Sequence, residues 1–387
     1  MLCVDVLYIG FLLALMFIAV HLRLHKICNM KKGIIIAICC VISSVHLFQS
    51  CKKDKDEEEE EHSIFQLFDV YFLGFEFDNE KPLSYYYKNE TAYPLHSQSD
   101  ARINPSDIVV ASGDVYVTGS ENEDDSFLYK PIRALLWKNG ELQELITPET
   151  TIEEAKAVFV HRNDVYVAGS YIPASGNKKR VGVVWKNGEP IMVSDGKETT
   201  FFEDVFVSGE DVFVVGYENI GGGIVSKYWK NSESVTLSNS ETTTYANSIY
   251  VNGADVYIAG YADAISDRSL KLWKNGQASS LISGKSVIRG GTVVVENGHT
   301  YVCGYEQVGS KYEPRLFKDG VIEPLEDKNS GHTYAVDLKV YQGNTLVLGR
   351  TDSESAAEPI LWFNGIPANI GNIGAGMGFI AFDVVPR

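Results

Sequence analysis

The chain has 387 residues, of which 45% are hydrophobic and 11% aromatic, so it is long enough to bury a sizeable core. Its formal net charge of −17 argues against nucleic acid or an anionic membrane surface as a partner, because both carry charge of the same sign. Four of the six cysteines lie in the first fifty residues, and the remaining two, Cys51 and Cys303, give no pattern of a disulfide framework or a zinc site.

Two apolar runs open the chain, over about residues 6–20 and 33–47. The second follows Met30-Lys31-Lys32, is too short to span a membrane comfortably, and ends shortly before Ser50-Cys51. This arrangement resembles a lipoprotein signal of the looser kind found in Bacteroidetes-type bacteria, which implies a signal peptide over residues 30–50 and a lipidated Cys51. Residues 1–29 then read as an upstream extension from a misplaced start. The alternative is that both runs form a two-span membrane anchor.

Residues 51–63 are highly charged and include five consecutive glutamates, Glu57 to Glu61. A run of like charges is typical of a solvated tether. Acids directly after a lipidated cysteine also resemble the export tag that carries lipoproteins to the cell surface. Together these features predict a lipid-anchored protein of the outer membrane that faces the cell surface.

One six-residue phrase of alternating residues, in most copies beginning with aspartate and always ending in glycine, recurs after residue 63. Its seven copies are Asp69–Gly74, Asp114–Gly119, Asp164–Gly169, Asp211–Gly216, Asp255–Gly260, His299–Gly304 and Asn344–Gly349. An aromatic anchor follows each copy, at Tyr87, Trp137, Trp185, Trp229, Trp273, Phe317 and Trp362. The repeat period of 44 to 50 residues, with four short strands in each repeat, predicts an all-β, seven-bladed β-propeller over residues 64–387.

The strands follow from the pattern within one repeat. Residues 248–251 and 255–260 alternate around a turn, and residues 270–273 and 277–282 flank Asn275-Gly276. Asn-Gly between alternating runs predicts a tight hairpin, because a type I′ turn needs positive φ at both central residues.

The two ends of the repeat region complement each other. The first repeat begins at its second strand, Asp69, whereas residues 380–384 match the first-strand phrase of residues 336–340. The C-terminal strand is therefore predicted to complete the N-terminal blade, which removes the open edges of the ring.

Residues that recur in every blade are expected to be structural, since a site needs asymmetry. The tryptophans are predicted to pack between neighbouring blades. The recurring aspartates and the lysines that follow the aromatic anchors are predicted to pair across strands, with His299 and Lys318 leaving the sixth repeat ambiguous. Cys303 lies within a strand and is expected to be a buried, inert thiol. The sequence predicts no catalytic residue, cofactor or metal site, because it contains no hydrolase, phosphate-loop, zinc or calcium motif.

Asymmetry enters in two places. The spacing from the Asp-type to the aromatic anchor is 18 residues in five blades, but 23 in the second and 21 in the third, so the loops over about Glu121–Arg133 and Tyr171–Val181 are longer. The residue after the repeat glycine also varies. The candidate ligand-binding residues at these places are Phe127, Tyr129, Tyr171, Lys178, Lys179, Arg180, Tyr217, Tyr261, Tyr305 and Arg350. Neutral loop variation and ordinary packing are the alternatives.

The phrasing V-Y-V-A-G … L-W-K-N-G resembles the repeats of uncharacterised β-propeller lipoproteins of Bacteroidetes-type bacteria and, more distantly, kelch-like propellers. The chain lacks the kelch double glycine and the Trp-Asp signature of WD40 repeats. We therefore expect a monomeric, membrane-anchored, non-catalytic binding module for a glycan or a protein. The alternatives are a propeller enzyme, such as a lyase, hydrolase or lactonase, and a scaffold subunit of a membrane assembly.

Overall fold

The computed structural model describes residues 63–76, 83–99, 101–122, 131–147, 150–176, 179–239, 243–264, 267–284, 286–327, 331–352, 357–371, 373 and 377–387. The predicted signal peptide, Cys51 and all of the charged tether except its last residue, Ser63, lie outside these residues. The compact unit His62–Arg387 holds its own hydrophobic cores and both strands that close the ring, so it can be studied as a separate protein. Among the described residues, no helix is long and apolar enough to cross a membrane.

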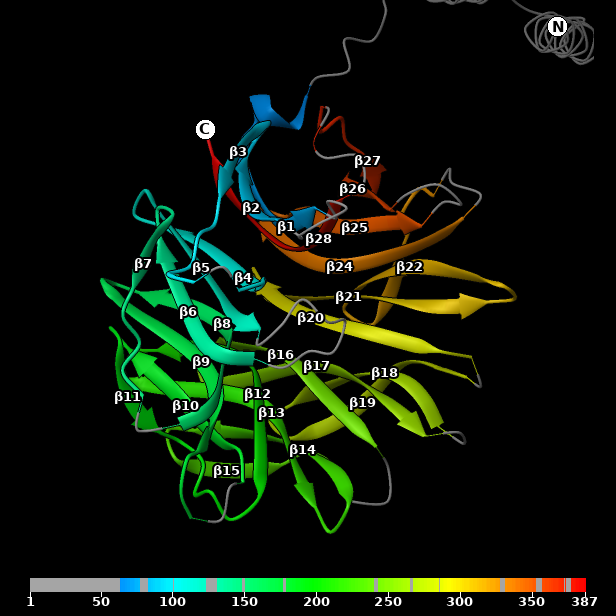
Figure 1. The fold of residues 1–387 in the computed structure, drawn as a ribbon. Coiled ribbons are helices and arrows are strands. Elements are labelled where there is room, and N and C mark those ends of the chain that lie inside the picture. The colour runs from blue at the N-terminus through cyan, green and yellow to red at the C-terminus, as the bar shows by residue number, and fades with distance from the viewer. Residues whose placement is uncertain are drawn as a thin grey trace, which may run out of the picture. The chain divides into compact units, whose positions relative to one another are not determined.

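The unit is a seven-bladed β-propeller in which each blade is a four-stranded antiparallel sheet, as the repeats predict (Figure 1). A short 3-10 helix, η1 (Ile64–Gln66), precedes the first strand. The first three blades, with the inner strand given first, consist of β28 (Met377–Pro386), β1 (Phe68–Glu76), β2 (Leu83–Lys88) and β3 (Thr91–Pro94); β4 (Ile103–Ala111), β5 (Asp114–Asn122), β6 (Pro131–Lys138) and β7 (Glu141–Gln143); and β8 (Thr150–His161), β9 (Asp164–Pro173), β10 (Val181–Lys186) and β11 (Glu189–Met192).

The remaining four blades follow in chain order around the ring (Figure 1). They consist of β12 (Thr199–Ser208), β13 (Asp211–Ile220), β14 (Gly223–Lys230) and β15 (Glu233–Thr236); β16 (Thr244–Asn252), β17 (Asp255–Ala264), β18 (Asp267–Lys274) and β19 (Gln277–Gly284); β20 (Ile288–Glu296), β21 (His299–Val308), β22 (Lys311–Lys318) and β23 (Val321–Glu323); and β24 (His332–Tyr341), β25 (Asn344–Asp352), β26 (Ala357–Phe363) and β27 (Ile366–Pro367).

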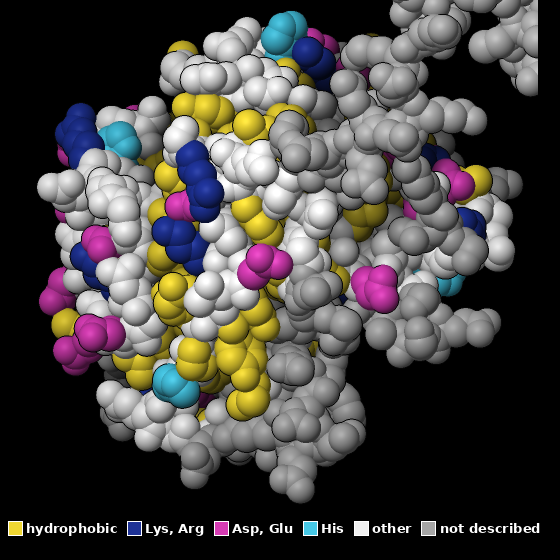
Figure 2. Space-filling view, turned by 90° about the horizontal axis from the view of Figure 1, so that it is seen from above, with side chains coloured by type: hydrophobic (Ala, Val, Ile, Leu, Met, Phe, Trp, Pro, Cys, Tyr) yellow, Lys and Arg dark blue, Asp and Glu magenta, His cyan; other side chains and the backbone are white. Residues whose placement is uncertain are grey.

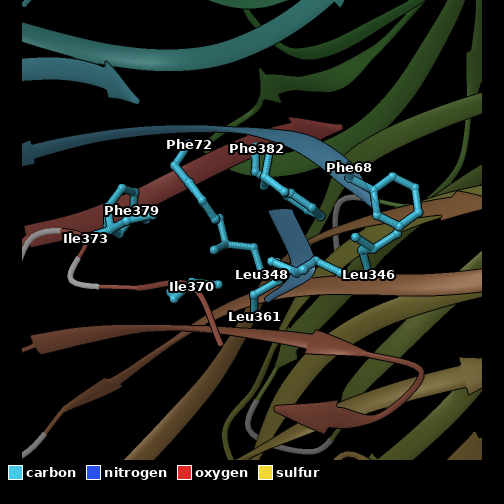
Figure 3. Packing of buried hydrophobic residues seen from close by; sticks show 11 residues of the cluster. Phe68, Phe72, Leu346, Leu348, Leu361, Ile370, Ile373, Phe379 and Phe382 are labelled. Atoms are coloured by element: carbon cyan, nitrogen blue, oxygen red, sulfur yellow. The ribbon is translucent and has the colours of Figure 1, made fainter. Parts of the chain in front are cut away.

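The C-terminal strand closes the ring, which confirms the prediction from the two ends of the repeat region. β28 pairs with β1 from Phe68 opposite Pro386 to Glu76 opposite Met377. Side chains of both strands enter one hydrophobic core with residues of the seventh blade (Figure 3). This core contains Phe68, Phe72, Leu346, Leu348, Leu361, Ile370, Ile373, Phe379 and Phe382.

The recurring tryptophans pack between blades, as predicted, and none exposes more than 2% of its surface. Trp185, for example, shares a core with Tyr116 and Leu136 of the preceding blade. Its indole N–H donates to the carbonyl of Ile146 at 2.9 Å, in the connection between the two blades. These side chains therefore stabilise the ring and are not available to stack on a ligand.

The recurring aspartates and lysines pair across strands, also as predicted. Five such pairs have Nζ–Oδ2 distances between 2.7 and 3.1 Å. In the sixth blade the partner of His299 is Asp319, at 2.6 Å, and in the seventh Asn364 donates to Asn344 at 3.0 Å. All seven contacts lie beside the turns between third and fourth strands, and we call this side of the ring the hairpin face.

The turn asparagines have a further role that the sequence pattern did not reveal. Asn139 has φ 55° and the following Gly140 φ 85°, as a type I′ turn requires. The Asn139 side chain donates to Asp114 at 2.8 Å and accepts from the backbone N–H of Val115 at 2.9 Å. Because the other Asn-containing turns repeat these contacts, each turn is fixed to its blade's second strand.

Large exposed hydrophobic residues lie mainly on the outer strands of the blades. These residues include Tyr93, Ile191, Met192, Val235, Val321, Ile322 and Ile366. On the side of the molecule seen in Figure 2, hydrophobic side chains lie among Lys and Arg side chains. Most outer strands have four residues or fewer, which limits the length of edge open to pairing with another chain.

Candidate functional site

The inner strand of every blade carries a β-bulge opposite the repeat glycine of the second strand. A Cβ atom on any of the seven glycines would lie less than 3.0 Å from a carbonyl oxygen of the inner strand. The repeat glycine is therefore required by close approach of two backbones. A bulge also redirects the neighbouring side chains, here at the end of the ring opposite the hairpin face. We call this end the mouth.

At the mouth, the residue after the repeat glycine faces, in the second to seventh blades, an inner-strand residue that lies 16 positions earlier in the chain, whereas in the first blade Phe75 faces Gly378 of β28. In blades 4 to 7 all eight of these positions are aromatic or arginine. The facing pairs are Phe201 and Tyr217, Tyr245 and Tyr261, Arg289 and Tyr305, and Tyr334 and Arg350. We call these eight residues, together with Arg180, the crescent.

Ring contacts join the crescent from blade to blade. Phe201 and Tyr217 stack at 5.0 Å, Tyr217 meets Tyr245 edge-on at 5.5 Å, and Tyr245 stacks on Tyr261 at 5.0 Å. Further round, Tyr305 meets Tyr334 edge-on at 4.9 Å.

Three arginines complete the row by lying over aromatic rings. Arg180 lies over Phe201 at 4.9 Å, Arg289 over Tyr261 at 4.7 Å, and Arg350 over Tyr334 at 4.8 Å. The second and third blades have Asn104, Ser120, Glu154 and Ser170 at the corresponding positions. The mouth is thus aromatic and cationic on one side and mostly small and polar on the other.

The structure brings five of the predicted candidate residues together and separates others from them. Tyr217, Tyr261, Tyr305 and Arg350 belong to the crescent, and Arg180 joins it through Phe201. Tyr171 is only 5% exposed and packs in the core between the second and third blades. Lys179 pairs with Glu198 at 2.8 Å. The candidates Phe127, Tyr129 and Lys178 lie outside the described residues.

Four members of the crescent were missed from the sequence: Phe201, Tyr245, Arg289 and Tyr334. They lie on inner strands, whose alternation gave no reason to single them out. The constant offset of 16 residues from the position after the glycine was a usable signal, because it identifies the facing residue in the second to seventh blades.

A charged pair lies one step deeper toward the axis, at two bulged positions. Lys156 and Glu203 approach to 3.4 Å. Burial raises the pKa of Glu203, Lys156 opposes this effect, and Glu154 adds to it. Burial, followed by Glu203 and Glu154, also raises the pKa of Tyr217, so these groups share one electrostatic environment.

Aspartates of the inner strands link neighbouring blades around the axis. The carboxylate of Asp107 accepts from Val158 N–H of the next blade at 2.9 Å, and Asp204 accepts from Ile249 N–H at 2.8 Å. Burial raises the pKa of Asp107 to about 7 and that of Asp204 to about 6. Lys339 lies in the same region, where burial would lower its pKa but nearby aspartates raise it. We assign these groups to the framework.

Two other kinds of site, a metal centre and a surface pocket, have weaker support than the crescent. Among the described residues, no group of three or more His, Cys, Asp or Glu side chains could hold a metal ion. A surface pocket of about 250 Å³ lies between the third and fourth blades on the hairpin side, lined in part by Ile191, Met192 and Val212. Lys186 in its wall is already paired with Asp164 at 2.8 Å.

Comparison with protein-family models and with curated protein sequences gives no match. Among solved structures, the chain is similar to a puromycin-hydrolysing peptidase of Mycobacterium tuberculosis, with 11% identity and a TM-score of 0.52 over 77% of this chain and 53% of the peptidase. The chain thus spans about half the length of that protein. A Bombyx mori GH32 beta-fructofuranosidase matches with 9% identity and a TM-score of 0.36, over 71% of this chain and 79% of that one. At such low identity, the likeness to the peptidase shows the propeller fold alone.

Proposed function

We propose that the protein is a lipid-anchored, non-catalytic binding module of the outer membrane whose ligand, a glycan or a protein, docks on the crescent. The observation that carries the proposal is the continuity of the crescent across the fourth to seventh blades. The second and third blades form the same sheet with Asn104, Ser120 and Ser170 in these positions. The framework therefore does not need aromatic side chains there, and a ligand gives them a role.

The path of the chain shows at which face the propeller is joined to the residues that precede it. β1 begins beside Pro386 at the hairpin face, where Asp69 pairs with Lys88. The chain therefore enters the propeller at the face opposite the crescent. A lipid on Cys51 would be joined to the propeller at that face, through the charged residues that follow the cysteine.

Binding at the crescent can be tested with the unit His62–Arg387 on a glycan array and in pull-downs from membrane extracts. We expect Tyr245→Ser to weaken binding by at least about tenfold, because it removes a ring that contacts two others. Tyr93→Ser is the matched control, since Tyr93 is an exposed aromatic residue on an outer strand. Equal binding by both variants and the parent would refute the proposal.

Anchoring is tested separately in the full-length chain. We expect Cys51→Ser to move the protein from the membrane fraction to the soluble fraction, because the acyl chains supply the membrane affinity. A mature protein that begins with an unblocked Met1 would contradict the lipoprotein assignment.

An enzyme is the second candidate function, and the convergence of Glu154, Lys156, Glu203 and Tyr217 favours it. A carboxyl group with a raised pKa beside a second carboxylate can act as a general acid. If this function holds, Glu203→Gln abolishes turnover of a bound glycan while its affinity remains. A parent protein that binds a glycan without cleaving it excludes this candidate for that glycan.

A further inference from the structure

The arginines of the crescent are each paired with a carboxylate. Nη1 of Arg180 lies 3.1 Å from Oε2 of Glu154, and Nη1 of Arg289 lies 2.8 Å from Oδ2 of Asp263. Nε of Arg350 lies 3.5 Å from Oδ1 of Asp352. Since every arginine also lies over an aromatic ring, each guanidinium is held on two sides. The crescent therefore presents fixed pairs of hydrogen-bond donors and acceptors.

These pairs differ in their access to solvent. The side chain of Arg180 is 11% exposed, that of Arg289 is 31% exposed and that of Arg350 is 44% exposed. Access thus increases toward the seventh blade. The pairs Arg289–Asp263 and Arg350–Asp352 are the ones that a ligand can reach.

Other crescent residues already contact the faces of two of the aromatic rings. Phe201 is covered by Tyr217 and Arg180, and Tyr261 is in contact with Tyr245 and Arg289. The hydroxyl of Tyr334, like that of an ordinary tyrosine, is protonated at neutral pH, and burial, followed by the Asp352 carboxylate, raises its pKa further to about 12. A ligand here meets phenol hydroxyls, guanidinium N–H groups and carboxylate oxygens side by side.

This chemistry suits hydroxyl groups better than anionic groups. A sugar hydroxyl both donates and accepts a hydrogen bond, and vicinal hydroxyls can span a neighbouring donor and acceptor. A carboxylate or sulfate group would approach Asp263 or Asp352 as well as the arginine. The net charge of −17 adds a general repulsion of polyanions.

We propose that the crescent binds an uncharged oligosaccharide across the fifth to seventh blades, with vicinal hydroxyls held by the Arg289–Asp263 and Arg350–Asp352 pairs. This inference rests on the proposed binding function and specifies its ligand class. It also places the main contacts away from the two long loops of the second and third blades.

Calorimetric titration of the unit His62–Arg387 tests the inference. The neutral probes are maltohexaose, cellohexaose and mannohexaose, and the anionic probes are hexagalacturonate and a chondroitin sulfate hexasaccharide. We expect the parent to bind at least one neutral probe and to bind the anionic probes at least about tenfold more weakly.

The decisive variant is Asp352→Asn, which replaces one carboxylate oxygen by an amide donor and leaves the Arg350 guanidinium without the negative charge that lies 3.5 Å from it. We expect at least about a tenfold loss of affinity for the neutral probe and a gain of affinity for hexagalacturonate. Asp164→Asn is the matched control, because Asp164 forms the same kind of pair with Lys186 on the hairpin face. A merely destabilising change would not reverse the preference for charge.

The outcomes separate the two proposals. An anionic probe bound more tightly by the parent and released by Tyr245→Ser overturns the inference and leaves a binding function at the crescent. If the parent binds none of the probes but captures a protein partner, and Tyr245→Ser no longer captures it, the inference is likewise overturned and a binding function at the crescent remains. Binding of any probe that survives Tyr245→Ser overturns both proposals.

Discussion

Replacement of Gly260 by alanine tests whether close backbone approach fixes the geometry of the mouth. The new Cβ would lie less than 3.0 Å from both the carbonyl oxygen of Tyr245 and the Cα of Ala246. Both neighbours are backbone atoms, so no side-chain rotation can relieve the overlap. The inner strand must move away from the second strand, and Tyr245 must move with it.

The expected change in the free energy of unfolding follows from two opposing effects. Loss of glycine freedom in the unfolded chain would stabilise the protein by about 0.4–1 kcal/mol. Overpacking of a tightly packed region costs about 1–3 kcal/mol. We therefore expect Gly260→Ala to lower the free energy of unfolding by roughly 1–2 kcal/mol and to weaken ligand binding at the crescent.

Urea unfolding followed by tryptophan fluorescence is a suitable assay, because all five tryptophans are buried. The midpoint should fall while the slope stays constant. Gly284→Ala is the control, since a Cβ there meets only the Ser286 nitrogen, at 3.8 Å. If Gly260→Ala unfolds at the same or a higher urea concentration than the parent, the explanation of the repeat glycine is refuted.

Three further predictions concern closure, the axis and the buried thiol. Deletion of residues 377–387 should unfold or aggregate the unit, because it removes β28 and the buried Phe379 and Phe382; a variant that melts like the parent would contradict the closure mechanism. The pKa of Asp107 is about 7 in the folded protein and about 4 in the unfolded chain, so its contribution to stability is complete below pH 4 and is lost as the pH rises through 7. Asp107→Asn should therefore remove roughly 2–4 kcal/mol of the decline in unfolding free energy between pH 4 and 7, whereas an unchanged slope would exclude this origin. Cys303 is 1% exposed and burial raises its pKa to about 12, so a thiol reagent should label the native unit only as fast as it unfolds, and rapid labelling would contradict its burial.

The framework was accessible from the sequence because its determinants are local and repeated. Asn275-Gly276 defines a turn by its own backbone preferences, and Trp185 recurs at the same place in the repeat as Trp137. Ring closure was predictable as well, since residues 380–384 match an inner strand that the first repeat lacks.

The site was only partly accessible because it depends on contacts between blades. Tyr171 lies two positions after its repeat glycine and Tyr217 only one, so their side chains point to opposite sides of the second strand. Tyr171 is buried in a core and Tyr217 lines the mouth. Alternation separates the two positions, but it does not reveal which inner-strand residue faces Tyr217, because that depends on the register and the bulge of the inner strand. The pairing of Arg289 with Asp263 joins two blades and has no local signature.

Ring closure by β28 also has a consequence for the order of assembly. β1 is the first strand of the propeller to be synthesised, and its inner neighbour is the last, about 300 residues later. At synthesis rates of roughly 5–20 residues per second, β1 waits on the order of 15–60 s with one edge unpaired. During that time six blades can form while the hydrophobic residues of β1 remain open to incorrect pairing. Chaperone capture would therefore be needed most at this first strand, and that need ends when β28 pairs with it.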